Sequence, residues 1–320
     1  MFHLIVHRPG AGFELDIPPE KISNLLQQPE TLTWLDLESP TPQEHQLLRD
    51  EFRFHPLAIE DTEHKHQRSK IERYADFYFL VVYVISYEDG TIQTYELDLF
   101  VGPNYLVTVH ALPLPVLSEV AVRWQREAVS LGGGIPALLY TLLDAVVDDI
   151  FPVVDTLGDQ IDDLEDQIFT AKESKVLQPI FQLKKDLLSL RRHIAPQRDV
   201  LNVLLRRELP FLDAQHAPYF QDVYDHVVRL TDNIDTYRDI LASAMDAYLT
   251  VVSNRLNQVM KTLTAMATIL MTLALVAGIY GMNFHNIPEL SWPYGYYYSL
   301  GLMAALGLAL SFYFWRKHWF

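Results

Sequence analysis

The side chains best suited to chemistry lie in one loop near the C-terminus, in the segment YGMNFHNIPEL from Tyr280 to Leu290. Asn283, His285 and Glu289 place an amide, an imidazole and a carboxylate in the only polar gap between two long apolar stretches. An amide oxygen is an uncharged acceptor. It suits a small hard cation such as Mg²⁺, which sheds its water reluctantly and can be held through that water. The loop therefore predicts recognition of a hydrated cation.

The two apolar stretches predict a transmembrane hairpin. Residues 262–282 carry no charged side chain, and neither do residues 296–315. About 20 apolar residues in a helix cross a hydrocarbon core of roughly 30 Å. Tyrosine and tryptophan side chains lie near both ends of the second stretch, as in the aromatic belts of membrane helices. The alternative, a buried hairpin of a soluble protein, is disfavoured because buried apolar helix segments usually run to only about 10–14 residues.

The distribution of basic residues predicts the orientation of this hairpin. The loop from Asn283 to Gly295 has no Lys or Arg. Basic residues gather on the cytoplasmic side of membrane spans. We therefore expect an integral protein of the cytoplasmic (inner) membrane with both termini in the cytoplasm. The basic residues that flank the outer ends of the two spans are Arg255, Lys261, Arg316 and Lys317.

The composition excludes several functions. The 320 residues include 41 acidic and 25 basic side chains, which gives a formal net charge of −16. Divalent cations are therefore expected partners, and nucleic acid is not. There is no cysteine, which excludes disulfides and thiolate chemistry. The chain has no HExxH, GxSxG or GxxxxGK[ST] motif. Nothing in the sequence predicts an enzyme.

The pattern upstream of the spans predicts three regions. Residues 1–130 mix strand-like and helical runs, which indicates a cytosolic α/β or α+β domain. The glycine-rich segment 131–136 breaks this pattern, and residues 131–258 are predicted to be helical, with a stalk helix at their end. Residues 259–320 hold the hairpin and a basic cytosolic tail. The strands are predicted at 2–6, 31–37, 77–86, 92–101 and 104–110, and the helices at 18–28 and 41–52.

The stalk is predicted to be one helix that continues into the first span. Neither proline nor glycine interrupts residues 219–277, and about 60 residues at about 1.5 Å each give a rod of about 90 Å. Aspartates on two helices could be a solvated face or a surface rich in divalent cations. These are Asp225, Asp232, Asp239 and Asp246, and Asp155, Asp159, Asp162, Asp163 and Asp166. The apolar seam steps by four and three along Val223, Val227, Leu230, Ile234, Tyr237, Leu241, Ala244 and Tyr248.

A hairpin of two helices cannot by itself enclose a path filled with water. If it conducts ions, it does so in a ring of identical subunits around an axis. Asn283 ends the first span, so a ring of such side chains would present several amide oxygens to one central cation. Self-assembly is then part of the predicted mechanism.

Taken together, these segments resemble the CorA family of magnesium transport proteins. The resemblance covers most of the chain and rests on YGMNF followed by IPEL, on two C-terminal spans, on the tail WRKHWF, and on HPLAIEDTEHKHQRSKIERY and FQDVYDHVVRLTDNIDTYRDIL upstream. It implies a funnel-shaped homopentamer in membrane lipid, with a cytosolic α/β/α domain, long stalk helices and two transmembrane helices. It also implies passage of Mg²⁺, with Co²⁺ or Ni²⁺, gated by intracellular Mg²⁺.

The resemblance also implies roles for individual residues. Gly281, Met282 and Asn283 match the selectivity filter, with His285 and Glu289 at the outer mouth. Asp61 and Asp222, with Glu60 and His226 close by, match carboxylates that bind the regulatory cation across a subunit boundary. The matches to pore-lining positions are Asn257, Met260, Leu263, Met271, Ala274 and Gly278, of which Met260 and Leu263 match the hydrophobic constriction.

Three departures from the family pattern leave alternatives open. Thr272 stands where relatives have proline, Ala274 where they have threonine, and His285 where they have an acid. A zinc-transporting branch of the same superfamily usually differs at the position of Met282, so Zn²⁺ transport, with or without proton coupling, is the alternative ion preference. A membrane-anchored metal sensor is the alternative from another functional class. Small residues such as Ala274 and Gly278 would also suit plain helix packing.

Overall fold

The computed structural model describes residues 2–15, 17–64, 67–127, 131, 133–170, 176–206, 215–283 and 287–319. Two compact units make up the chain: Met1–Gln167 with Ala171–Ala242, and Ile168–Thr170 with Ser243–Phe320. The division at residues 130 and 258, which follows changes in sequence pattern, stays a prediction.

The first unit contains a mixed sheet that, in the described residues, has seven strands in the order β2-β1-β3-β7-β6-β5-β4. β3 and β7 are parallel, and the other neighbours are antiparallel. All five predicted strands are confirmed. The additional strands, β2 and β4, have four residues each and form the two edges. The bounds are β1 (Phe2–Arg8), β2 (Gly12–Leu15), β3 (Leu32–Glu38), β4 (Lys70–Arg73), β5 (Tyr78–Glu88), β6 (Thr91–Val101) and β7 (Tyr105–His110).

Helices account for most of the remaining described residues. The predicted helix start at Thr41 is confirmed, because its hydroxyl accepts from the Glu44 N–H while the Glu44 carboxylate accepts from the Thr41 N–H. The bounds are η1 (Pro19–Lys21), α1 (Ile22–Leu26), α2 (Pro42–Asp50), α3 (Pro56–Glu63), α4 (Pro115–Glu127), α5 (Gly134–Asp148), α6 (Ile150–Thr170), α7 (Leu177–Leu205), α8 (Ala217–Tyr280), η2 (Pro288–Ser291) and α9 (Gly295–Arg316).

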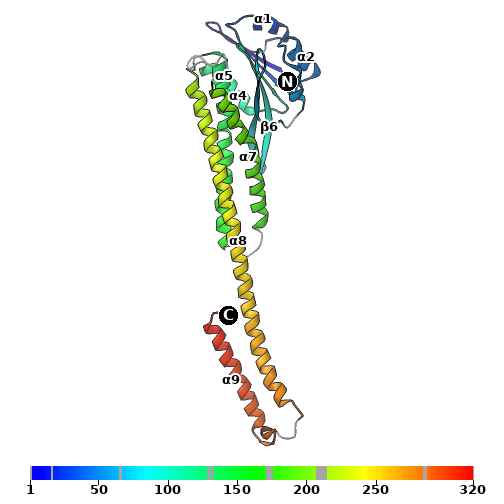
Figure 1. Cartoon of the computed structure of the whole chain (residues 1–320), viewed down its shortest axis with the longest axis vertical. Coiled ribbons are helices and arrows are strands. Elements are labelled where there is room, and N and C mark those ends of the chain that lie inside the picture. The colour runs from blue at the N-terminus through cyan, green and yellow to red at the C-terminus, as the bar shows by residue number, and fades with distance from the viewer. Residues whose placement is uncertain are drawn as a thin grey trace. The chain divides into compact units, whose positions relative to one another are not determined.

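Helices cover both faces of the sheet, as predicted for an α/β/α domain. Trp34 and Phe100 pair with the adjacent residues Leu106 and Val107 of β7, and so point to opposite faces. On one face Phe54, which precedes α3, stacks on Phe100 with ring centroids 4.1 Å apart. On the other face Trp124 of α4 lies 6.1 Å from Trp34. α5 and α7 also contact the sheet, and α7 runs beside β6 (Figure 1).

A close approach in the β6–β7 turn gives a stability prediction. A Cβ at Gly102 would lie 2.3 Å from Cζ of Tyr105, a buried ring that also packs edge-on against Phe52. Because the ring cannot move without opening the core, Gly102→Ala should lower the free energy of unfolding by about 1–3 kcal/mol. Thermal unfolding of the full chain measures this. Adding Tyr105→Leu should recover part of the loss, and wild-type stability of Gly102→Ala alone would refute the packing argument.

The apolar seam of α8 is buried as the heptad pattern predicts. Every predicted seam residue is at most 8% exposed except Tyr237, which is half-buried. Tyr237 packs on α6 at Gly158, where a Cβ would lie 2.5 Å from the tyrosine Oη. The four aspartates that repeat every seven residues along α8 are exposed and do not take part in this seam. The prediction of one uninterrupted helix is also confirmed, since α8 has 64 residues.

Among the described residues, two helices are long and apolar enough to cross a membrane, and the second unit holds the C-terminal part of one, α8, and all of the other, α9. Only 6% of the most apolar window of each helix is buried within the chain. A core helix of a soluble protein would be mostly buried. The alternative of a buried soluble hairpin is therefore disfavoured by the structure as well as by length.

Candidate functional site

The Gly-Met-Asn triplet directly follows the last residue of α8. The Gly281 N–H donates to the Ala277 carbonyl at 2.9 Å, and the Met282 N–H donates to the Ile279 carbonyl at 3.3 Å. All three residues of the triplet are exposed. The C-terminal end of a helix carries partial negative charge from its unpaired carbonyls. Asn283 therefore adds its amide oxygen where the backbone already favours a cation.

The two residues predicted for the outer mouth lie beyond this triplet. His285 is outside the described residues. Glu289 lies in η2 and is half-buried. Glu289 is therefore partly accessible to solvent, and its role at the outer mouth stays a prediction.

The six residues predicted to line a pore all lie exposed on the surface of the single chain. The opposite side of α8 packs against α9 and the residues that follow it. There the Thr262 hydroxyl donates to the Trp319 carbonyl at 2.9 Å, Ala265 is fully buried, and Leu273 approaches Gly307. At about 3.6 residues per turn these two sets of side chains are on opposite faces of α8. The predicted pore face is thus part of the surface that α9 leaves uncovered, which is most of this span, since only 6% of its most apolar window is buried.

Threonines beside this face were not predicted as pore groups. Thr264 and Thr268 are exposed, and Thr272 is half-buried. The Thr268 and Thr272 hydroxyls each donate at 2.8 Å to the carbonyl four residues earlier. A polar group in a membrane span needs such an internal partner. The i, i+4 spacing of threonines in an apolar stretch was the signal available in the sequence.

Asp61, predicted to bind a regulatory cation, already has a basic partner. Its carboxylate accepts from Lys70 Nζ at 2.7 Å, and Glu72 accepts from the same amine at 2.8 Å. Burial alone would lower the pKa of Lys70, but the hydrogen bonds and charges of Asp61 and Glu72 outweigh burial and raise it. Glu60, the neighbour of Asp61, is exposed. A cation that binds Asp61 must therefore compete with a charged lysine.

The structure brings Asp222 and His226 of α8 together with a carboxylate of α5. His226 Nε2 lies 4.0 Å from Asp222 Oδ1, and His226 Nδ1 lies 3.5 Å from Asp148 Oδ1. Asp144, one turn before Asp148, is buried and accepts from Arg123 at 2.7 Å. Burial and then the charge of Asp144 raise the pKa of Asp148. A positive ion near these carboxylates would relieve both effects.

Within the described residues, the only set of three or more metal-ligating atoms that all lie within 4.8 Å of one another belongs to Asp144, Asp148 and His226. Sequence reasoning found His226 and missed Asp144 and Asp148. The signal in the sequence was a pair of carboxylates at i, i+4 in a segment whose other residues are almost all apolar. The aspartate rows of α6 and α8 form no such set in the described residues.

Within one chain three of the four predicted regulatory residues divide into two clusters, and Glu60 is exposed beside Asp61. Asp61 belongs with Lys70 and Glu72, whereas Asp222 and His226 belong with Asp148. A site that joins Asp61 to Asp222 would have to form between neighbouring copies of the chain.

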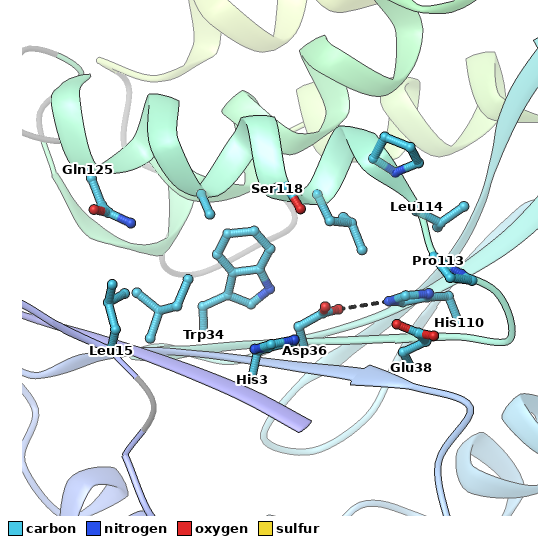
Figure 2. Close-up of a pocket in the computed structure, with 14 residues that line it drawn as sticks. His3, Leu15, Trp34, Asp36, Glu38, His110, Pro113, Leu114, Ser118 and Gln125 are labelled. Atoms are coloured by element: carbon cyan, nitrogen blue, oxygen red, sulfur yellow. Dashed lines mark hydrogen bonds and ion pairs between the residues drawn. The ribbon is translucent and has the colours of Figure 1, made fainter. Parts of the chain in front are cut away.

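In a further cluster of ionisable groups, Asp36 and His110 pair with each other. The cluster lines a cavity of about 430 Å³ under α4, where Asp36 and His110 point toward each other with Glu38 beside them (Figure 2). His110 Nε2 lies 3.1 Å from Asp36, and its Nδ1 lies 2.6 Å from the Leu112 carbonyl. Both ring nitrogens face acceptors, so the imidazole makes both contacts as donors when it is protonated. This arrangement indicates a structural role.

The Asp36–His110 pair predicts that stability falls as pH rises. Burial alone would lower the pKa of His110, but Asp36, the Leu112 carbonyl and Glu38 outweigh burial and raise it above 6.5. The stabilisation is therefore complete below about pH 6.5 and is lost as pH rises through the folded-state pKa. From about pH 6 to about pH 9 the melting temperature of the wild type should fall more than that of Asp36→Asn. Equal pH slopes would contradict this.

Comparison with known proteins places the chain among transporters. It matches the model of the family described as CorA-like Mg2+ transporter protein over residues 29–317. The Bacillus subtilis protein YfjQ is 37% identical over 306 residues, 95% of this chain and 94% of that protein. The cobalt/magnesium transport protein CorA of Thermotoga maritima is 37% identical over 276 residues, 84% of this chain and 77% of that protein.

A solved structure shares the whole fold. The complete structure of the CorA magnesium transporter from Methanocaldococcus jannaschii superposes with a TM-score of 0.83 over 99% of this chain and 98% of that one, at 24% identity. Together with the two apolar helices, these relatives identify a membrane protein. Since the family match and the relatives at 37% identity span most of the sequence, the chain belongs to the family of CorA-like Mg²⁺ transporter proteins.

Proposed function

We propose that this chain forms a homopentameric channel that passes Mg²⁺, and also Co²⁺ or Ni²⁺, across the cytoplasmic membrane. The observation that carries the proposal is the uncovered face of α8, which bears all six predicted pore residues and ends at Asn283. In a ring of copies this face would turn inward, since α9 occupies the opposite side. The names of two relatives, which specify cobalt and magnesium transport, support Mg²⁺ and Co²⁺ as cargoes.

The chemistry of that face suits a hydrated cation. Its side chains are apolar or small from Leu263 to Gly278, so they would bind the ion weakly and let it leave. Met260 and Leu263 would form the narrowest apolar ring. Gly281 and Met282 would position Asn283 at the mouth, with His285 and Glu289 around it. Asn257 would be the polar group at the other end. This is transport without bond making, and we assign no catalytic role to the chain.

Intracellular Mg²⁺ would act on the cytosolic carboxylates. Carboxylate oxygens are the ligands that Mg²⁺ prefers. Asp61, with Glu60 beside it, would meet Asp222 of a neighbouring copy, and His226, Asp148 and Asp144 would lie next to this contact. The group of Asp144, Asp148 and His226 supports the proposal, because its ligand atoms already converge. Lys70 would act as a competitor for Asp61.

The basic residues outside the hairpin support an orientation with both termini in the cytoplasm of an inner membrane. A tag after Phe320 should then be reachable only from the inside, whereas a label on a cysteine introduced at His285 should react from the outside. Since the chain has no cysteine of its own, labelling would be specific. A protected loop with an outward-facing C-terminus would refute the orientation.

Ion flux into liposomes tests the proposal as a whole. The purified protein should admit Mg²⁺, Co²⁺ and Ni²⁺ without requiring a pH gradient. Preference for Zn²⁺ together with dependence on a pH gradient would favour the zinc-transporting alternative. Cation binding with no flux of any ion would favour the membrane-anchored sensor.

A further inference from the structure

A cavity of about 550 Å³ lies on the sheet face that α2 and α3 cover. Glu96 and Asp98 of β6 and Val109 of β7 line it from the sheet, and His45 of α2 and Glu63 of α3 line it from the helices. All of these residues belong to the first compact unit. None of them is a residue that the proposed transport mechanism uses.

Two buried polar atoms of this cavity lack partners. Asp98 is 4% exposed, and its Oδ1 is buried with no hydrogen-bond partner in the part of the chain that the structure describes. The same holds for Nε2 of His45. Leaving a buried polar atom unpaired costs about 1–3 kcal/mol, and more for a charged group. A ligand with polar groups inside the cavity would complete both atoms.

The charges around the cavity select a cation. Among the described residues, its lining includes the carboxyl groups of Glu63, Glu96 and Asp98 and neither Lys nor Arg. The net negative charge of these residues disfavours phosphates and other anions. Burial, followed by the charges of Glu96 and Asp61, raises the pKa of Asp98 well above its usual range, and Lys70 only partly opposes this. A positive group inside the cavity would relieve the repulsion that these carboxylates exert on one another.

The arrangement of ligand atoms favours an organic cation over a metal ion. In the described residues no three metal-ligating atoms of this cavity come within 4.8 Å of one another, in contrast to Asp144, Asp148 and His226. The volume falls in the range of small-molecule pockets, about 300–1,000 Å³. Val109, Ala111 and Leu112 add apolar lining. Separate carboxylates joined by apolar surface match ammonium groups joined by methylenes.

We propose that this cavity binds a small aliphatic di- or polyammonium ion. One ammonium group would donate to Asp98 Oδ1 and His45 Nε2, and a second would donate to Glu63 at the rim, in competition with Arg49, whose Nη2 lies 3.6 Å from Glu63 Oε1. His45 Nδ1 lies 3.9 Å from Glu63 Oε1, so the unpartnered Nε2 is the ring nitrogen left to face the ligand. The methylenes would lie along the apolar lining. Glu96 already accepts from the Tyr83 hydroxyl at 3.0 Å and would supply charge only.

Calorimetric titration of the full-length protein in detergent, at constant Mg²⁺ and physiological salt, tests the site. Putrescine and spermidine should bind saturably at one site per chain. The neutral isostere 1,4-butanediol should not bind. Asp98→Asn keeps the side-chain shape and should weaken binding at least about tenfold, as expected for the loss of one charge-assisted hydrogen bond. Glu63→Gln, at the exposed rim, should weaken binding as well and tests the site if Asp98→Asn fails to fold.

Asp186→Asn is the matched control, because Asp186 is similarly buried but bonded to Gln182 and lies outside the cavity. It should leave binding unchanged. The proposal is overturned if neither amine binds, if 1,4-butanediol binds as well as putrescine, or if folded Asp98→Asn and Glu63→Gln both bind with wild-type affinity. None of these results would bear on Mg²⁺ flux.

Discussion

Asn283→Ala should abolish selective Mg²⁺ uptake and leave assembly intact. The side chain is exposed at the end of α8, so its removal creates no cavity in a packed core. In a ring, however, it removes every amide oxygen from the mouth at once. A hydrogen bond that involves a charged group is worth about 1.5–3 kcal/mol, and each 1.4 kcal/mol is about a factor of ten in occupancy. Loss of even one contact should reduce selective entry at least about tenfold.

Flux into liposomes, with Mg²⁺ against Co²⁺, Ni²⁺ and Zn²⁺, measures this effect, and size-exclusion chromatography reports assembly. Asn24→Ala is the control, because Asn24 is an exposed asparagine on α1, remote in sequence from the hairpin. It should transport like the wild type. If the assembled Asn283→Ala protein keeps wild-type flux and selectivity, the amide does not select the ion.

Much of the fold follows from local sequence patterns. The five predicted strands are rich in β-branched and aromatic residues, and the seam of α8 repeats over several turns, so each carries its signal within itself. The edge strands β2 and β4 were missed because they have four residues each and are not buried on either face. α3 was missed because it is capped by His55, whose Nδ1 accepts from the Leu57 N–H, instead of by a residue that usually caps helices.

The parts of the candidate site made of residues adjacent in sequence were predictable. The parts made of residues that tertiary packing brings together were less so. Asn283 was found because the triplet adjoins a span that the composition defines. The pairing of Asp61 with Lys70 depends on how β4 lies against α3 and left no local signal. Asp144 and Asp148 are turned toward His226 by the packing of α5 with α8, two helices far apart in sequence. Long-range packing of this kind has no signature in a single sequence.

Neutralising Asp61 and Asp222 together should leave a channel that conducts at intracellular Mg²⁺ levels that close the wild type. Each chain carries a formal charge of −16, so five chains carry −80, and carboxylates that meet at subunit boundaries repel one another unless a cation lies between them. In the proposed closed state Asp61 and Asp222 of neighbouring copies share that cation. α8 carries Asp222 near one end and Met260 and Leu263 further along, so one continuous helix links the boundary to the constriction.

The size of the effect is set by the difference in cation affinity between the closed and open states, because a ligand shifts an equilibrium only by that difference. Coupling between sites is typically about 5- to 150-fold. Asp61→Asn with Asp222→Asn should therefore raise the half-inhibitory internal Mg²⁺ concentration by a factor in that range, and Mg²⁺ should no longer protect α8 from proteolysis. Lys70→Met tests the competitor: with its amine gone, Asp61 should bind the cation more tightly, and the half-inhibitory concentration should fall.

The control for charge alone is Asp225→Asn with Asp232→Asn, two exposed aspartates of α8 whose neutralisation changes the net charge by the same amount. This variant should keep wild-type inhibition and protection. If it loses them to the same degree, general repulsion governs closure and no specific site is needed. If instead the Asp61 and Asp222 variant keeps wild-type inhibition and protection, these two acids make ordinary surface contacts, and the cation that closes the channel binds elsewhere. The next residues to test are then Asp144, Asp148 and His226, because their ligand atoms already converge within a single chain.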